Sequence, residues 1–100
     1  MYKAGWDMSE GMQEKVTWEK TTEEKFRKLL EQIPDLIRGI AEIRVTKKVE
    51  SIIRQENRFE VTEKDLVDAL FSETPPGFVP AMKQSMDELG IDYTKFGYEK

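Results

Sequence analysis

Pro34 divides a long helical pattern into two parts. Before it, apolar residues recur at the three- and four-residue spacing of one helix face: Phe26, Leu29, Leu30 and Ile33. Proline has no N–H to donate and disfavours helical geometry in the preceding residue, but it is well tolerated in the first turn of a following helix. Asp35 suits that first turn because its charge meets the positive end of the helix dipole. The sequence therefore predicts a corner between two helices at Pro34.

The two predicted helices around this corner have different patterns. Thr21 and Glu24 fit a capping box, so we expect the first helix to begin at Thr21. The second helix, over about residues 35–57, would be about 33 Å long. Its first half is apolar around most of its circumference, and we expect that half to be enclosed on several sides: Leu36, Ile37, Ile40, Ala41 and Ile43. Its second half carries a single apolar stripe.

Basic side chains line the other face of the second half, at about 100° per residue. We call this row the basic ridge: Arg44, Lys47, Arg54 and Arg58. It is either a solvated face with acidic neighbours or a patch for an acidic partner or phosphates. The sequence leaves both interpretations open.

A short extended link and a capped helix follow the second helix. Phe59 and Val61 alternate with a polar residue, which predicts that both face the core. Thr62 is a strong N-cap candidate, with Asp65 three residues later as a capping-box analogue. Val61 and Leu66 have the spacing of a hydrophobic staple. The sequence therefore predicts a third helix beginning after Thr62.

Residues 72–80 form a proline- and glycine-rich loop, after which Pro80 can open a fourth helix that ends at Gly90. The aromatic tail that follows either folds back over the bundle or docks on another protein: Tyr93, Phe96 and Tyr98. Residues 1–20 have no steady period. Their apolar residues belong either to a frayed terminus or to a docking peptide that becomes ordered on a partner: Trp6, Met8 and Met12.

These patterns predict an all-α protein: a small bundle of about four helices, with a short extended link before the third helix and flexible termini. We expect a flexible arm over residues 1–20, a helical domain over residues 21–90 and an aromatic tail over residues 91–100. The predicted core is Phe26, Leu29, Leu30, Ile33, Ile37, Ile40, Val49, Ile52, Phe59, Leu66, Leu70 and Met86.

Residue counts exclude most familiar active sites. The 100 residues include no cysteine and no histidine, which excludes the usual zinc sites, cysteine-ligated iron–sulfur clusters, disulfides and histidine-dependent nucleophiles. We therefore expect neither an enzyme nor a bound metal or cofactor. No apolar run approaches the ~20 residues of a membrane-spanning helix. The first residues also lack the apolar core of a secretory signal, so we expect no membrane insertion and a cytoplasmic location.

Several residues occur in an order that is characteristic of one protein family. Trp18 precedes the first amphipathic helix, and the pair Ile33–Pro34 ends it. Arg38 follows the proline by four residues, and Thr62 caps the third helix after the long charged second one. This order resembles the small C-terminal domain of the B subunit of light-independent protochlorophyllide reductase, which also occurs as short free-standing proteins. The resemblance covers roughly residues 18–71.

The resemblance implies an accessory or regulatory module in chlorophyll biosynthesis, photosynthetic complexes or related anaerobic metabolism. It does not imply reductase activity, because the parent enzyme's clusters and main catalytic residues lie in other domains. The chain departs from the family at Asp35 and Leu36, where the family usually has aromatic residues. Two roles for Arg38 stay open. It either pairs with Glu42 or an acid of the first helix, or binds a partner's carboxylate or a tetrapyrrole propionate.

We therefore expect a non-catalytic accessory subunit that docks on a larger protein complex through its arm and tail. One alternative is nucleic-acid binding through the basic ridge, although the net charge of −4 argues against a general nucleic-acid binder. The other is tetrapyrrole binding between the second and fourth helices, near Gly39 and the methionines.

Overall fold

The computed structural model describes residues 16–100. Trp6, Met8 and Met12 lie outside the described residues. The helices are α1 (Lys20–Glu31), α2 (Asp35–Gln55), α3 (Glu63–Glu73) and α4 (Val79–Glu88), with two short strands, β1 (Thr17–Trp18) and β2 (Glu60–Val61). Two 3-10 turns, η2 (Pro76–Phe78) and η3 (Tyr93–Phe96), flank α4 in the chain. This confirms the predicted class, a small all-α bundle.

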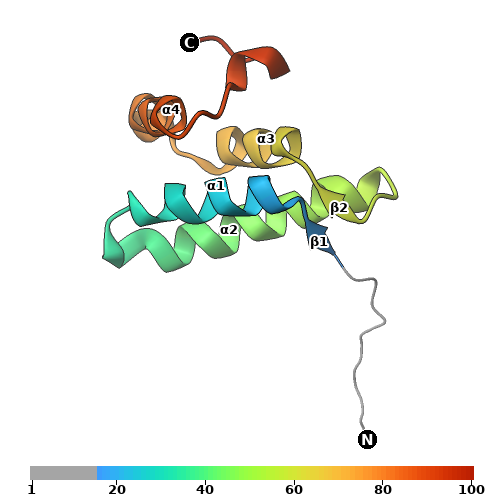
Figure 1. Cartoon of the computed structure of the whole chain (residues 1–100). Helices are drawn as coiled ribbons and strands as arrows, with labels where there is room; N and C mark the ends of the chain where they lie inside the picture. Colours follow the sequence, from blue (N-terminus) through green and yellow to red (C-terminus); the bar gives the residue numbers. More distant parts are fainter. Residues whose placement is uncertain (1–15) are drawn as a thin grey trace, which may run out of the picture.

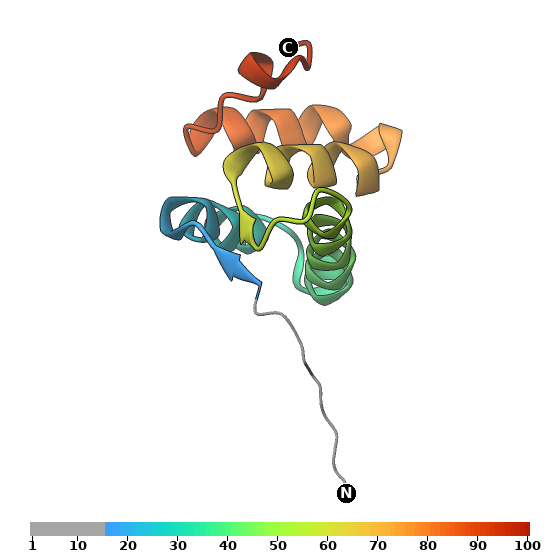
Figure 2. The same cartoon turned by 90° about the vertical axis from the view of Figure 1, so that its right-hand side faces the viewer.

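The helices form three layers (Figures 1 and 2). α1 and α2 lie side by side and antiparallel, and α3 covers them. α4 lies above α3 and runs across the direction of α1 and α2, while η3 packs against α3. The tail therefore folds back over the bundle, which was one of the two alternatives that the sequence left open.

The two strands tie the start of the described chain to the link before α3. β1 and β2 pair in parallel, with Thr17 opposite Glu60 and Trp18 opposite Val61. The Trp18 ring stacks on Phe26, with the ring centroids 5.3 Å apart. The sequence predicted the extended link but not its partner strand. Residues 17–20, which we expected in the flexible arm, belong to the folded part.

The helix boundaries agree with the predicted corner at Pro34 and differ at the first helix start. α1 ends three residues before Pro34, and α2 begins directly after it. α1 begins one residue before Thr21, so the capping box that we expected from Thr21 and Glu24 is wrong. Glu19 is the N-cap instead, and its carboxylate accepts a hydrogen bond of 2.7 Å from the Thr22 hydroxyl.

The predicted start of α3 and end of α4 are both present. Thr62 and Asp65 form the capping box of α3, and the Asp65 carboxylate accepts the Thr62 N–H at 2.9 Å. Gly90 ends α4 with a φ of +77°, a conformation that glycine adopts without steric cost. The Ile91 N–H then returns to the Met86 carbonyl at 2.8 Å.

Most of the predicted core is buried, but three members are exposed. The buried ones are Phe26, Leu29, Leu30, Val49, Leu66, Leu70 and Met86, and Ile33 and Ile52 are partly buried against them. Ile37, Ile40 and Phe59 lie on the surface, so their assignment to the core is wrong. The helical period correctly predicted the buried stripe in the second half of α2. It could not tell which side of the first half another helix would cover.

Replacing Leu66 by alanine should lower the free energy of unfolding by about 2–5 kcal/mol, because this side chain is fully buried between the helices. Leu36→Ala is the matched control, since Leu36 is 92% exposed, and it should change that free energy by less than about 0.5 kcal/mol. Urea denaturation followed by circular dichroism measures both. A Leu66→Ala variant as stable as Leu36→Ala would contradict the core described here.

Candidate functional site

The first half of α2 presents large apolar side chains to solvent. Leu36 is 92% exposed, and Ile40 and Ile43 are each 57% exposed. Their spacing of four and three residues places them on one side of the helix. The buried residues of α2 all lie further along, at Val45 and beyond. The expectation that this half is enclosed on several sides is therefore wrong, because no described element covers its outer side.

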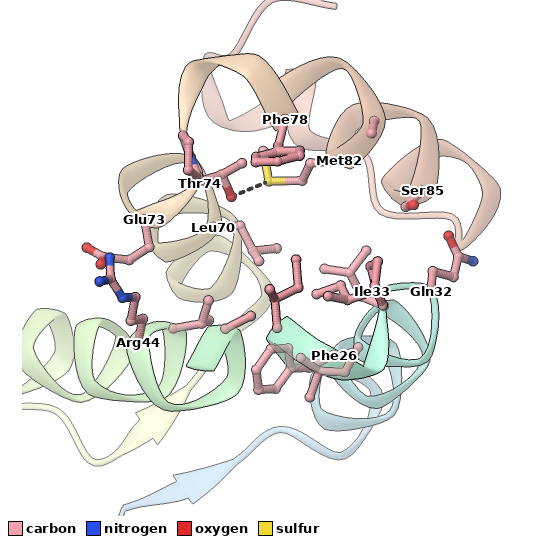
Figure 3. Close-up of a pocket in the computed structure, with 18 residues that line it drawn as sticks. Phe26, Gln32, Ile33, Arg44, Leu70, Glu73, Thr74, Phe78, Met82 and Ser85 are labelled. Atoms are coloured by element: carbon pink, nitrogen blue, oxygen red, sulfur yellow. Dashed lines mark hydrogen bonds between the residues drawn. The ribbon is translucent and has the colours of Figure 1, made fainter. Parts of the chain in front are cut away.

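A pocket opens beside this half of α2, between α1, α2 and the segment from the end of α3 into α4 (Figure 3). Its volume is about 250 Å³. Phe26, Leu30 and Leu70 are among the buried side chains that line it, while the exposed Ile37 and Phe78 belong to opposite walls. The pocket therefore offers an apolar hollow directly beside the exposed part of α2.

We call this surface the apolar face. It consists of the pocket and of Leu36, Ile37, Ile40, Ile43 and Phe78. Ile37 connects the two parts, because it lines the pocket and is also a helix neighbour of the outward residues. Contiguous exposed apolar patches are uncommon on monomeric proteins, and large ones mark binding surfaces.

Few polar groups accompany the apolar face. Arg44 and Glu73 lie near each other at one end of the pocket, and Gln32 and Ser85 lie at the other end (Figure 3). The Thr74 hydroxyl is hydrogen-bonded to the Met82 sulfur at 3.1 Å. Within residues 16–100, no group of three or more acidic residues is arranged to hold a metal ion. The chemistry of this surface is therefore that of apolar contact with a charged rim.

Arg38 closes the corner between α1 and α2. Its Nε donates to the Leu30 carbonyl at 2.8 Å, and one Nη donates to the Ile33 carbonyl at 2.9 Å. The same Nη lies 2.8 Å from a carboxylate oxygen of Asp35. The last carbonyls of a helix have no partner within the helix, and Arg38 supplies one. These contacts are structural, but they involve backbone carbonyls and Asp35 rather than the predicted Glu42.

Arg58 does not extend the basic ridge as a free cation. Its two terminal nitrogens bind the two carboxylate oxygens of Asp65 at 3.0 and 2.7 Å, and Asp65 is only 2% exposed. Burial opposes ionisation of Asp65, but hydrogen bonds from Arg58 and Thr62 outweigh it and hold the pKa of that carboxyl below its usual value. The sequence missed this pair because its two members are separated by the extended link.

The remaining members of the ridge differ in their surroundings. Arg54 lies 3.8 Å from a carboxylate oxygen of Glu50. For Arg44 and Lys47, no carboxylate of the described part of the chain lies within 4.0 Å. Both are exposed and follow the apolar residues of α2 directly. The ridge thus reduces to two cations beside the apolar face that have no ion pair within 4.0 Å in the described part of the chain.

The aromatic tail is occupied by contacts within the chain. Tyr93 is buried, and Phe96 is partly buried against the core. The Tyr98 ring stacks on Phe71 at 4.0 Å, and its hydroxyl donates to Asp68 at 2.6 Å. The sequence-based hypothesis that these aromatic residues dock on a partner therefore needs correction, because folding already uses them. Trp6, Met8 and Met12, the other members of that hypothesis, precede the described residues.

The residues that the sequence indicated for a tetrapyrrole do not converge. Met82 lines the pocket, but Met86 is fully buried in the core. Gly39 does not line the pocket, and a Cβ added to it would meet no atom within 4 Å. The pocket volume of about 250 Å³ is also below the range of roughly 300–1,000 Å³ that is usual for small-molecule sites.

Sequence reasoning missed the pocket itself. One of its walls comes from Pro75, Phe78 and Met82, and the first two lie in a stretch that the sequence indicated only as a loop. No local pattern marks them, since a pocket exists only after α4 has packed across α1 and α2. An aromatic residue within a proline-rich loop is the one sequence signal that could have drawn attention to Phe78.

Replacing Asp65 by asparagine should destabilise the protein at neutral pH by removing the charge partner of Arg58. A carboxyl with a lowered folded-state pKa stabilises the fold above its unfolded pKa of about 3.9 and loses that contribution as the pH falls through the folded value. The stability difference between the native chain and Asp65→Asn should therefore shrink below about pH 4. Urea unfolding between pH 2 and 7 measures it; a difference independent of pH would contradict the role of the charge.

Burial, together with the hydrogen bond to Asp68, raises the pKa of Tyr98 to about 12. A raised tyrosine pKa stabilises the fold below the unfolded value of about 10, and the contribution is lost as the pH rises towards 12. The native chain should therefore lose stability over that interval relative to Tyr98→Phe, which cannot ionise there. Unfolding measured from pH 9 to 12 tests this, and an equal alkaline loss in both proteins would contradict it.

The described residues include no helix that is both long and apolar enough to cross a membrane. Comparison of the chain with models of protein families, with curated proteins and with solved structures finds no match.

Proposed function

We propose that this protein is a non-catalytic interaction subunit that docks on a larger protein complex through the apolar face. The observation that carries the proposal is the exposure of Leu36, Ile40 and Ile43 on one side of α2. Full burial of such a side chain contributes about 1.5–3 kcal/mol. A partner that covered this half of α2 would gain most of that contribution at Leu36 and about half of it at Ile40 and at Ile43.

The make-up of the apolar face supports the proposal. Protein interfaces typically have an apolar centre, in which a few anchoring side chains fill pockets, surrounded by a polar rim. Here Ile37 lines a pocket, Ile40 lies three residues further along the same helix, and Arg44 and Lys47 lie at the edge. The face also belongs to rigid helices, one of which Arg38 joins firmly to its neighbour.

The setting of the complex is proposed from the family resemblance. On that basis the protein is an accessory subunit in photosynthesis or in chlorophyll and tetrapyrrole metabolism, located in the cytoplasm. Two of the motif residues that carry the resemblance have structural contacts: Trp18 stacks on Phe26, and Arg38 closes the end of α1. These contacts give both residues a part in holding this fold, and the accessory role is proposed from the resemblance alone. Trp6, Met8 and Met12 are proposed as additional contacts.

Site-specific photo-crosslinking tests the docking function. A benzophenone amino acid replaces Ile40 in the full chain, which is expressed in its native host and irradiated. We expect one predominant adduct with a larger protein, because position 40 would lie inside the interface. Mass spectrometry of the adduct then shows whether the partner belongs to tetrapyrrole metabolism.

Gln55 provides the control position. It is exposed on the same helix but lies about 22 Å further along it, at 1.5 Å per residue. The benzophenone at position 55 should give no such adduct. The docking function fails if position 40 gives no adduct, or if the two positions give the same pattern.

A further inference from the structure

We infer that the occupant of the apolar face is an amphipathic helix of the partner whose polar side carries carboxylates. This inference rests on the proposed function and adds the chemistry of the partner. It depends on two independent features of the surface: the distribution of charge along α2 and the shape of the pocket beside it.

Along its outward side, α2 changes from apolar to cationic. Ile40, Ile43 and Lys47 follow one another on that side at spacings of three and four residues, and Arg44 lies next to them. Neither cation has a carboxylate of residues 16–100 within 4.0 Å. Of the nearby acids, Glu50 is engaged with Arg54, and Glu73 lies near Arg44 at the end of the pocket (Figure 3). Because Arg44 and Lys47 outnumber Glu73 there, this edge of the surface is positive on a chain whose net charge is −4.

Electrostatic complementarity then defines the partner. A segment that places apolar side chains on Ile40 and Ile43 continues over Arg44 and Lys47. Carboxylates at that end would form charge-assisted hydrogen bonds with these cations, whereas basic side chains would be repelled. The apolar contact provides affinity, and the two cations decide the direction and the sign of charge of the bound segment.

The pocket favours a helix as the bound element. Its volume of about 250 Å³ equals about eight waters at ~30 Å³ each, which suits one or two large side chains. Helices that bind in grooves insert such anchors at spacings of three, four and seven residues. Met82 in the wall can adapt to the shape of an inserted side chain. A flat lipid surface would leave this hollow unfilled.

A second copy of this chain is a poorer match than an acidic helix. A second α2 laid on the first would present the same outward apolar residues, followed by the same Arg44 and Lys47. Asp35, at the start of α2, is already paired with Arg38. Within residues 16–100, Glu73 at the end of the pocket is the carboxylate that the face offers to its two cations, so a second copy would bring more positive than negative charge to the contact.

Peptide display tests the inference on the full chain. The library consists of amphipathic helical peptides with a fixed leucine and phenylalanine stripe and with Glu, Lys or Gln at random in the polar positions. It is selected on the native chain and counter-selected on Ile40→Asp, whose fold is checked by circular dichroism. We expect enrichment of Glu at the polar positions that flank one end of the stripe.

Charge-reversal variants measure how much the two cations contribute to peptide affinity. Fluorescence anisotropy of one enriched peptide should show binding that weakens about tenfold or more in Arg44→Glu/Lys47→Glu. The matched control is Lys20→Glu/Lys28→Glu, which makes the same change in net charge on exposed positions of α1 and should leave the affinity unchanged. Equal losses in both variants would overturn the inference, because they would reflect net charge alone.

The remaining outcomes separate this inference from the proposed function. Enrichment of Lys or Gln would overturn the acidic partner and leave docking at the apolar face intact. A dimer in sedimentation that Ile40→Asp dissociates would assign the face to a second copy. Flotation of the chain with phosphatidylcholine–phosphatidylglycerol vesicles would assign it to a membrane surface. No enrichment over Ile40→Asp, together with a specific adduct at position 40, would mean that the partner is not a helix.

Discussion

The packing of α3 against the second half of α2 determines how the rest of the chain can be arranged. Val49, Ile53 and Leu66 are completely buried in this part of the core. At about 100° per residue, Val45, Val49 and Ile53 lie on one side of α2, whereas Leu36, Ile40 and Ile43 lie on the opposite side. The described helices pack on the first side and leave the second side uncovered. Exposure of these three residues therefore follows from the side of α2 on which the core forms.

Charged and aromatic contacts hold α3 in this position from both sides. On the side of α2, Arg58 binds the buried Asp65 at the start of α3. On the opposite side, Tyr98 binds Asp68 and stacks on Phe71. Because the tail serves this purpose, its aromatic residues are withdrawn from the surface. Within residues 16–100, this leaves the outer side of α2 and the pocket beside it as the surface on which the proposed docking relies.

Features that depend on neighbouring residues could be predicted from the sequence, and features that depend on packing could not. Pro34, the Thr62 capping box and Gly90 each act on residues within one or two helical turns. The helix boundaries that they predicted are all present. Ile40 looked like a core residue, because period alone does not reveal which side of a helix its neighbours cover. The pocket could not be predicted either, since it forms between segments distant in sequence.

Thiol reactivity tests the central claim, that the first half of α2 is uncovered in the isolated chain. The native sequence has no cysteine, so Ile40→Cys and Val45→Cys each introduce a single reporter on the same helix. Modification by a soluble maleimide is followed in both folded proteins. We predict that position 40 reacts almost as fast as in the urea-unfolded chain, while the buried position 45 is protected. Protection at position 40 in the isolated monomer would contradict the account, because the chain itself would then cover the face.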